Sequence, residues 1–168
     1  MSNHSKGPKI VIPKTKSEWI LDSIGLMTFL GSIVFLLLIW NDIPDKVPGH
    51  YNAMGEVDRW GEKWELILLP AIGATILIGL GVLEKFPEVH NYPQRLNERN
   101  AHYFYVNSRK LLNQLKNSSQ IIFALILFES VSIALGWGHG FGVWFLPIFL
   151  FSVGIPIALA LIQQSKIK

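Results

Sequence analysis

The sequence contains no cysteine among its 168 residues. This absence excludes disulfides, thiolate metal sites and cysteine nucleophiles, and it leaves the redox compartment undetermined. The motifs His-Glu-x-x-His, Gly-x-Ser-x-Gly and the phosphate-binding Gly-x-x-x-x-Gly-Lys are also missing. We therefore expect a protein that is not an enzyme and that carries no cofactor.

Charge is scarce and unevenly placed. Only 16% of the residues are charged, whereas 50% are hydrophobic, and every Lys and Arg lies outside four apolar stretches. A helix of about 20 residues crosses a hydrocarbon core of roughly 30 Å. We predict an all-α integral membrane four-helix bundle, with Trp residues near the span ends at headgroup level. The expected spans are residues 19–40 (beginning at Trp19 or Ile24), 64–83, 121–137 and 142–162.

Basic residues gather on one side of these spans. Twelve lie in the leader, in segment 84–120 and in the tail, and three lie in segment 41–63. The positive-inside rule then places both termini in the cytoplasm of a multi-pass protein of the cell membrane. The same asymmetry explains the net charge of +3, so we expect no nucleic-acid partner. Residues 1–18 form a cytoplasmic leader before one membrane domain, 19–168, whose first span is an uncleaved anchor.

The long cytoplasmic segment has a helical pattern of its own. Asn97 is a candidate N-cap for a helix that begins at Glu98. An apolar stripe runs beside basic residues further along: Leu111, Leu112 and Leu115 next to Arg109, Lys110 and Lys116. Such an amphipathic helix either lies on the inner leaflet or continues directly into the third span.

Small residues recur at four-residue spacing in two spans, namely Ala71, Thr75 and Gly79, and Ser152, Pro156 and Ala160. Small residues let helix backbones approach closely in lipid. We interpret them as packing seams of the bundle, and a homodimer interface is the alternative that the sequence does not distinguish.

Segment 43–63 is unusually dense in Pro, Gly, aromatic and polar side chains, which predicts a structured extracellular loop. Its candidate ligand-binding residues are His50, Tyr51, Asn52, Glu56, Asp58 and Trp60. Three interpretations stay open: these groups satisfy the backbone of a tight loop, they recognise a ligand or peptide, or some of them bind a divalent cation together with His139. Because the spacing matches no standard metal loop, we assign no metal site.

The same loop carries a family resemblance. The run Ile-Pro-x-x-x-Pro-x-His-Tyr-Asn-x-x-Gly-Glu-x-Asp-x-Trp-Gly-x-Lys precedes a span that contains Pro70. It resembles the signature of a bacterial membrane domain of unknown function that forms the N-terminal part of SdpI-type immunity proteins. Asn91-Tyr92-Pro93, Asn100 and Arg109-Lys110-Leu111-Leu112 resemble that family's second, cytoplasmic motif.

The resemblance implies a membrane protein that senses or neutralises a peptide or an envelope stress. Its expected partners are the lipid bilayer, a secreted antimicrobial peptide at the outer face, and a cytoplasmic repressor. The best-known relatives carry further spans, whereas only residues 142–162 follow the domain here.

Glu129 is the acidic residue that lies deep inside a predicted span. A carboxylate there is costly when charged, so it is normally neutral, paired, or turned to a wet interior. Leu125, Ser132 and Gly136 share its helical face, which indicates that it points into the bundle. It is either a glutamic acid that hydrogen-bonds a neighbouring helix or a proton or ion site. The second interpretation predicts a small proton-coupled transporter as the alternative function.

Overall fold

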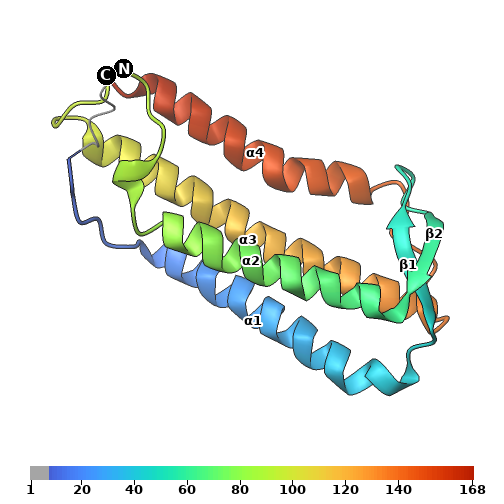
Figure 1. Ribbon diagram of the computed structural model, residues 1–168. Helices are drawn as coiled ribbons and strands as arrows, with labels where there is room; N and C mark the ends of the chain where they lie inside the picture. Colours follow the sequence, from blue (N-terminus) through green and yellow to red (C-terminus); the bar gives the residue numbers. More distant parts are fainter. Residues whose placement is uncertain (1–7) are drawn as a thin grey trace, which may run out of the picture.

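The computed structural model describes residues 8–168, and its long elements are four helices (Figure 1). They are α1 (Lys16–Ile39), α2 (Leu68–Leu83), α3 (Ala101–Ala134) and α4 (Phe145–Lys166). A hairpin of β1 (Lys46–Tyr51) and β2 (Val57–Glu62) lies between α1 and α2, flanked by short 3-10 turns at Trp40–Asp42 and Lys63–Ile67; a third turn, Pro87–Val89, follows α2. The hairpin lies at one end of the bundle, the hairpin end. Residues 8–15 and the C-terminus lie at the other, the termini end.

Each of the four long helices, taken with its adjoining turns, is long and apolar enough to cross a membrane. The prediction of a helical, multi-pass membrane protein is therefore confirmed. Exposed apolar side chains cover the outer surfaces of the helices, as expected for a surface that lipid solvates. The first seven residues of the predicted leader lie outside the described residues.

The first helix begins at Lys16, before either predicted start, because Thr15 caps it. The Glu18 amide donates to the Thr15 hydroxyl, and the Glu18 carboxylate accepts from the Thr15 amide. This reciprocal pair satisfies two backbone donors that the helix itself leaves free. The cap places Glu18 and Asp22 in the first two turns of α1.

The third helix is continuous from Ala101 to Ala134. The prediction of a separate amphipathic helix on the inner leaflet is therefore wrong, and the alternative, a helix that continues directly into the third span, is correct. The predicted start at Glu98 is also wrong. The Asn97 side chain accepts from the amides of Arg99 and Asn100, which folds a turn just before the helix. The helix therefore begins three residues later than its cap signal indicated.

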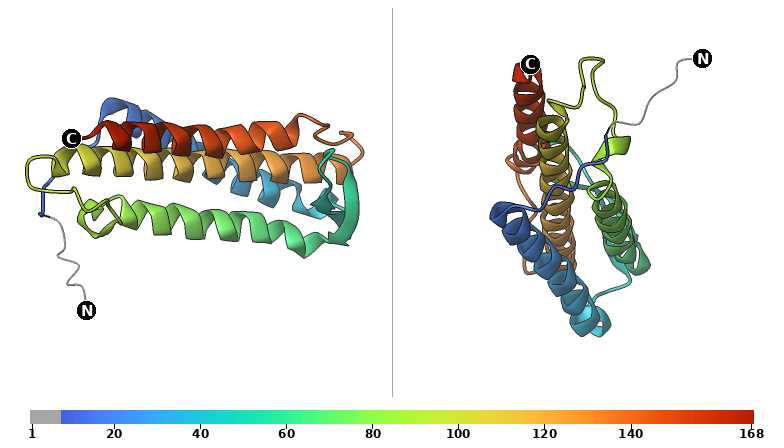
Figure 2. Two further views of the ribbon diagram at one scale, coloured as in Figure 1. Left: turned by 90° about the horizontal axis from the view of Figure 1, so that it is seen from above. Right: turned by 90° about the vertical axis from the view of Figure 1, so that its left-hand side faces the viewer.

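Helix α3 is the centre of the bundle. Helices α1, α2 and α4 and strand β1 all pack against it, and the end-on view shows α3 between the other helices (Figure 2). It is the least apolar of the four spans and has the largest buried share. Many of its polar side chains are buried against the other helices, among them Asn113, Asn117 and Gln120.

Two glycines set the helix spacing. A Cβ atom built on Gly25 of α1 would lie 2.2 Å from the Asn117 side-chain oxygen, and one on Gly73 of α2 would lie 3.1 Å from that of Gln120. The predicted seam at Ala71, Thr75 and Gly79 is exposed instead. The small residues of α4 are less exposed than their neighbours, and Ala160 is buried and accepts a hydrogen bond from Asn107 of α3.

A methyl group added at Gly25 should destabilise the protein. Gly25→Ala displaces Asn117 from its buried position, and overpacking of this kind costs about 1–3 kcal/mol. Gly31→Ala is the matched control, because nothing lies within 4 Å of its added Cβ atom. Thermal unfolding in detergent micelles should show a clear loss for Gly25→Ala and none for Gly31→Ala. Equal melting temperatures would contradict the close approach of α1 and α3.

Candidate functional site

The hairpin presents three cross-strand pairs on one face, which we call the outward face. Side chains two residues apart along a strand share a face, and β1 and β2 are antiparallel with irregular register near His50. From base to tip the register pairs Lys46 with Glu62 and Pro48 with Trp60; beyond the irregularity, where the register sets His50 against Arg59, the His50 side chain contacts Asp58. An aromatic ring thus lies between the Lys46–Glu62 ion pair and the His50–Asp58 contact.

The pair nearest the tip is well formed and open to solvent. His50 Nδ1 lies 2.6 Å from Asp58 Oδ1, with the side chains 64% and 43% exposed. The Trp60 residue is 52% exposed although it lies opposite a buried proline. These three groups can contact a molecule that approaches the hairpin.

The turn of the hairpin is fixed by Asn52. Its side-chain oxygen accepts from the amides of Met54 and Glu56 at 2.9 and 3.0 Å, and its amide group donates to the Glu56 carboxylate. Gly55 has φ of +76°, and a Cβ atom there would lie 2.5 Å from the Gly142 carbonyl oxygen. The turn therefore requires glycine for its conformation and for its contact with the loop between α3 and α4.

Tyr51 attaches the tip of the hairpin to the bundle. Its hydroxyl lies 2.8 Å from the Ser130 hydroxyl of α3, and its ring meets Phe141 edge-on at 5.3 Å between centroids. Burial raises the pKa of the Tyr51 phenol, so this group is a neutral hydrogen-bonding partner at physiological pH. Tyr51 and Asn52 thus have structural roles.

The base of the hairpin is part of an apolar core. Val47 is fully buried and packs with residues of α1, of the flanking turns and of α3, namely Leu36, Ile43, Leu66, Leu127 and Val131. Lys63 donates to the Ile43 carbonyl, and Arg59 donates to the Gly49 carbonyl and to Glu65. The hairpin is consequently a rigid platform rather than a free loop.

The six predicted contact residues therefore divide into two groups. Tyr51 and Asn52 hold the hairpin in place, whereas His50, Glu56, Asp58 and Trp60 are exposed. No three His, Asp or Glu side chains converge as metal ligands anywhere in residues 8–168. The arrangement is one of solvent-facing polar side chains around an aromatic ring.

Glu129 lies near the hairpin end of α3, five residues before the helix ends at Ala134. Its carboxylate accepts from the Gly140 amide at 3.0 Å, so its partner is the loop after α3 and not a neighbouring helix. Gly138 also lies against it. Glu129 thereby fixes the loop on which the hairpin turn rests.

The sequence interpretation missed a cluster of charges buried between helices. Arg109 of α3 and Glu18 of α1 form an ion pair, with Arg109 Nε 2.8 Å from Glu18 Oε1 and both side chains at most 4% exposed. The Arg109 guanidinium also donates to the Ile12 and Pro13 carbonyls. The segment before α1 is thus fastened to the core of the bundle.

A second group of charges lies beside this pair, among α1, α2 and α3. Asp22 lies 2.6 Å from Lys14 and 2.9 Å from Lys116, while Glu84 lies 2.6 and 2.7 Å from the same two ammonium groups. The contacts to Glu84 depart from hydrogen-bond geometry, so they act as ion pairs. Two cations and two carboxylates neutralise one another.

Lys14 takes part in this group of ion pairs although it precedes the first helix, which begins at Lys16. Burial alone lowers the pKa of its ammonium, but the hydrogen bond to Asp22 and the nearby Glu84 carboxylate outweigh burial and raise the pKa above its ordinary value. The stabilisation from this cation is complete below pH 10.5, the ordinary value, and is lost as the pH rises through the raised pKa. Lys14 is therefore charged under physiological conditions.

Amide side chains on one face of α3 complete the cluster. Asn113 and Asn117 donate to Asp22, and Gln120 donates to the Gly73 carbonyl of α2. The spacing of Arg109, Asn113, Asn117 and Gln120 marks one helical stripe, and Glu18 and Asp22 are four residues apart on α1. This matched spacing of polar residues is the pattern in the sequence that indicates a buried polar contact between α1 and α3. We call this cluster the polar core; its members are Lys14, Glu18, Asp22, Glu84, Arg109, Asn113, Lys116, Asn117 and Gln120.

Asn100 and Arg109, the residues expected in a cytoplasmic motif, are both buried. The Asn100 amide group donates to the Arg95 and Lys168 carbonyls, which joins the start of α3 to the C-terminus of the chain. Lys116 is buried as well, so the expected basic face beside the leucine stripe is not formed. The positive charges of Arg109 and Lys116 take part in internal ion pairs.

Removing one partner of the Arg109–Glu18 pair should destabilise the protein strongly. Arg109→Gln leaves the Glu18 carboxylate buried without a counter-ion, which costs about 3–5 kcal/mol, and Glu18→Gln strands Arg109 in the same way. The double variant should lose less than the sum of the two single losses, because it buries no unpaired charge. Unfolding measured for all four proteins in micelles tests this. Strict additivity would show that the two groups do not interact.

Comparisons with known proteins point to a family of unknown function. Residues 27–74 match a family model described as Domain of unknown function (DUF1648), a segment that includes most of α1, the whole hairpin and the start of α2. The chain is similar to an "Uncharacterized protein" of Archaeoglobus fulgidus, 33% identical over 107 residues, which are 62% of this chain and 57% of that protein. The chain thus spans little more than half the length of this relative. No solved structure matches the present chain.

Proposed function

We propose that this is a non-enzymatic membrane protein that binds an amphipathic, membrane-active peptide on the outward face of its hairpin. The observation that carries the proposal is the rigidly held hairpin, which keeps Trp60 and the His50–Asp58 pair exposed. Such a protein would protect the cell as the SdpI-type immunity proteins that its loop motif resembles do. The relation to those proteins remains a prediction.

The hairpin lies where such a peptide would arrive. Exposed Trp residues surround the hairpin end, namely Trp60, Trp64, Trp137 and Trp144. Tryptophan prefers the headgroup level of a bilayer, which is also where amphipathic peptides bind. A peptide adsorbed on the membrane would therefore meet the outward face without leaving the interface.

The chemistry of the outward face suits a charged and partly apolar peptide. Trp60 offers a large, exposed contact surface, and aromatic residues of this kind carry much of the energy in protein interfaces. The Lys46–Glu62 pair and the Asp58 carboxylate offer both signs of charge to a peptide side chain. In addition, β2 is the edge of a two-stranded sheet, a position where an extended peptide can add a strand.

The proposal requires the hairpin end to face the outside of the cell. The predicted asymmetry of basic residues supports this orientation, because the described residues at the termini end carry most of the Lys and Arg. A repressor bound from the cytoplasm would have to contact other residues than Asn100 and Arg109, since both are buried.

Cysteine labelling of whole cells tests the orientation, because the natural chain has no cysteine. Met54→Cys places a thiol at the exposed turn of the hairpin, and Lys85→Cys places one at an exposed position of the termini end. A maleimide that does not cross membranes should label the first variant in intact cells and the second only after lysis. Labelling of the Lys85→Cys variant in intact cells would reverse the assignment.

Challenge of producing cells with membrane-active peptides tests the function. His50→Ala, Asp58→Asn and Trp60→Ala should reduce protection to the level of a deletion strain, since loss of a central aromatic contact alone weakens binding by about 30-fold or more. Asp45→Asn and Trp144→Ala are the matched controls: each removes a similar exposed group that does not belong to the outward face. Both should protect fully.

Glu129→Gln distinguishes this proposal from proton-coupled transport. Its amide oxygen can still accept from Gly140, so the loop and the hairpin should stay in place and protection should persist. If Glu129→Gln abolishes protection at normal protein levels while His50→Ala and Asp58→Asn keep it, peptide recognition by the hairpin is wrong.

A further inference from the structure

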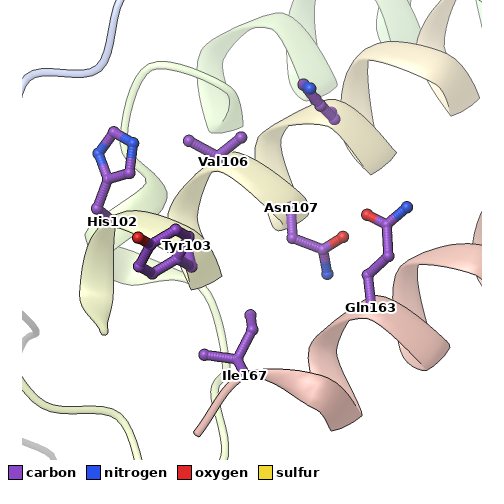
Figure 3. Close-up of a pocket in the computed structure, with 7 residues that line it drawn as sticks. His102, Tyr103, Val106, Asn107, Gln163 and Ile167 are labelled. Atoms are coloured by element: carbon purple, nitrogen blue, oxygen red, sulfur yellow. The ribbon is translucent and has the colours of Figure 1, made fainter. Parts of the chain in front are cut away.

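A cavity of about 380 Å³ lies at the termini end, between the first turns of α3 and the last turns of α4. Its lining residues are His102, Tyr103, Val106, Asn107, Lys110, Gln163 and Ile167. Figure 3 shows Asn107 and Gln163 reaching into the space between the two helices, with Tyr103 and Ile167 beside it. Neither the hairpin nor the polar core contributes to this site.

The lining is basic and partly apolar. It contains no carboxylate, and Lys110 is half-buried without an ion pair or a hydrogen bond to any other residue from 8 to 168. Val106 and Ile167 add apolar surface, while His102 and Tyr103 bring further polar groups. A half-buried ammonium without a counter-charge favours an anionic ligand, and the apolar lining favours one that carries a hydrocarbon part.

The height of the cavity along α4 supports the same ligand. The apolar residues Leu159, Leu161 and Ile162 are at least 50% exposed, as expected for a surface in contact with hydrocarbon. The next residue, Gln163, lines the cavity, and the basic residues Lys166 and Lys168 follow. The cavity therefore lies where the hydrocarbon ends and the phosphate groups of the membrane begin.

We propose that this cavity binds one anionic phospholipid, with the phosphate at Lys110 and the upper part of an acyl chain against Val106 and Ile167. The lipid would fasten α4 to α3. Helix α4 has the smallest buried share of the four spans. Few hydrogen bonds join this end of α4 to the rest of the protein; they include those from Asn107 to the Ala160 carbonyl and from Arg95 to the Gln164 carbonyl. The site does not depend on the proposed function of the hairpin.

Native mass spectrometry of the purified full-length protein with phosphatidylglycerol and with phosphatidylcholine tests the proposal. The natural protein should retain phosphatidylglycerol in preference to phosphatidylcholine. Lys110→Gln should weaken phosphatidylglycerol binding about fivefold, the contribution expected of one lysine at an anionic surface. Lys85→Gln, which removes an exposed charge at the same end but outside the cavity, should leave binding unchanged.

Three results would overturn the proposal. Equal losses in Lys110→Gln and Lys85→Gln would mean that general surface charge attracts the lipid. No preference for phosphatidylglycerol in the natural protein would remove the anionic lipid as ligand. Inorganic phosphate that competes at millimolar concentration would identify the cavity as a site for free anions. Should Lys110→Gln fail to fold, Val106→Trp takes its place: it fills the cavity without changing the charge and must also reduce lipid binding.

Discussion

The pairing of charges buried between the helices is the constraint on which the rest of this structure depends. A charge left without a partner at Glu18, Arg109, Glu84 or Lys116 would be very costly, because each of these side chains is at most 7% exposed. Arg109, Lys116 and Lys14 are therefore matched by Glu18, Asp22 and Glu84. This matching fixes how the three helices are rotated and how far along their axes they are displaced. Apolar packing in lipid does not specify either quantity as strictly.

The central helix transmits this order to the hairpin end. The rotation that turns Arg109 toward α1 also turns Leu127, Val131 and Ser130 toward the hairpin, because all of them lie on one rigid helix. Val47 and Tyr51 attach to those residues, and Glu129 holds the loop that supports the hairpin turn. The exposed tip pair is thus positioned by a chain of contacts that starts in the polar core. A preorganised surface binds its partner at a smaller entropic cost than a flexible loop does.

The two ends of the bundle therefore have different characters. At the hairpin end, a small sheet is held firmly and presents exposed aromatic and polar side chains. At the termini end, the basic residues that the positive-inside rule counts serve several purposes: Arg109 and Lys116 neutralise buried carboxylates, and Lys110 faces a cavity. The basic residues of α3 thus both neutralise buried carboxylates and line a cavity.

The sequence by itself determined the membrane location, the four spans and the segment between the first two as the site of greatest interest. These features follow from local composition, since long apolar stretches and dense turn-forming residues act without regard to partners far along the chain. Only the tertiary structure decided the roles of individual polar residues. Asn97 was mistaken for the helix cap, and Arg109 and Lys116 for a surface face, because a charge reveals its partner only when the helices meet. Glu129 was recognised as unusual, yet its partner Gly140 is set by the loop that returns after α3.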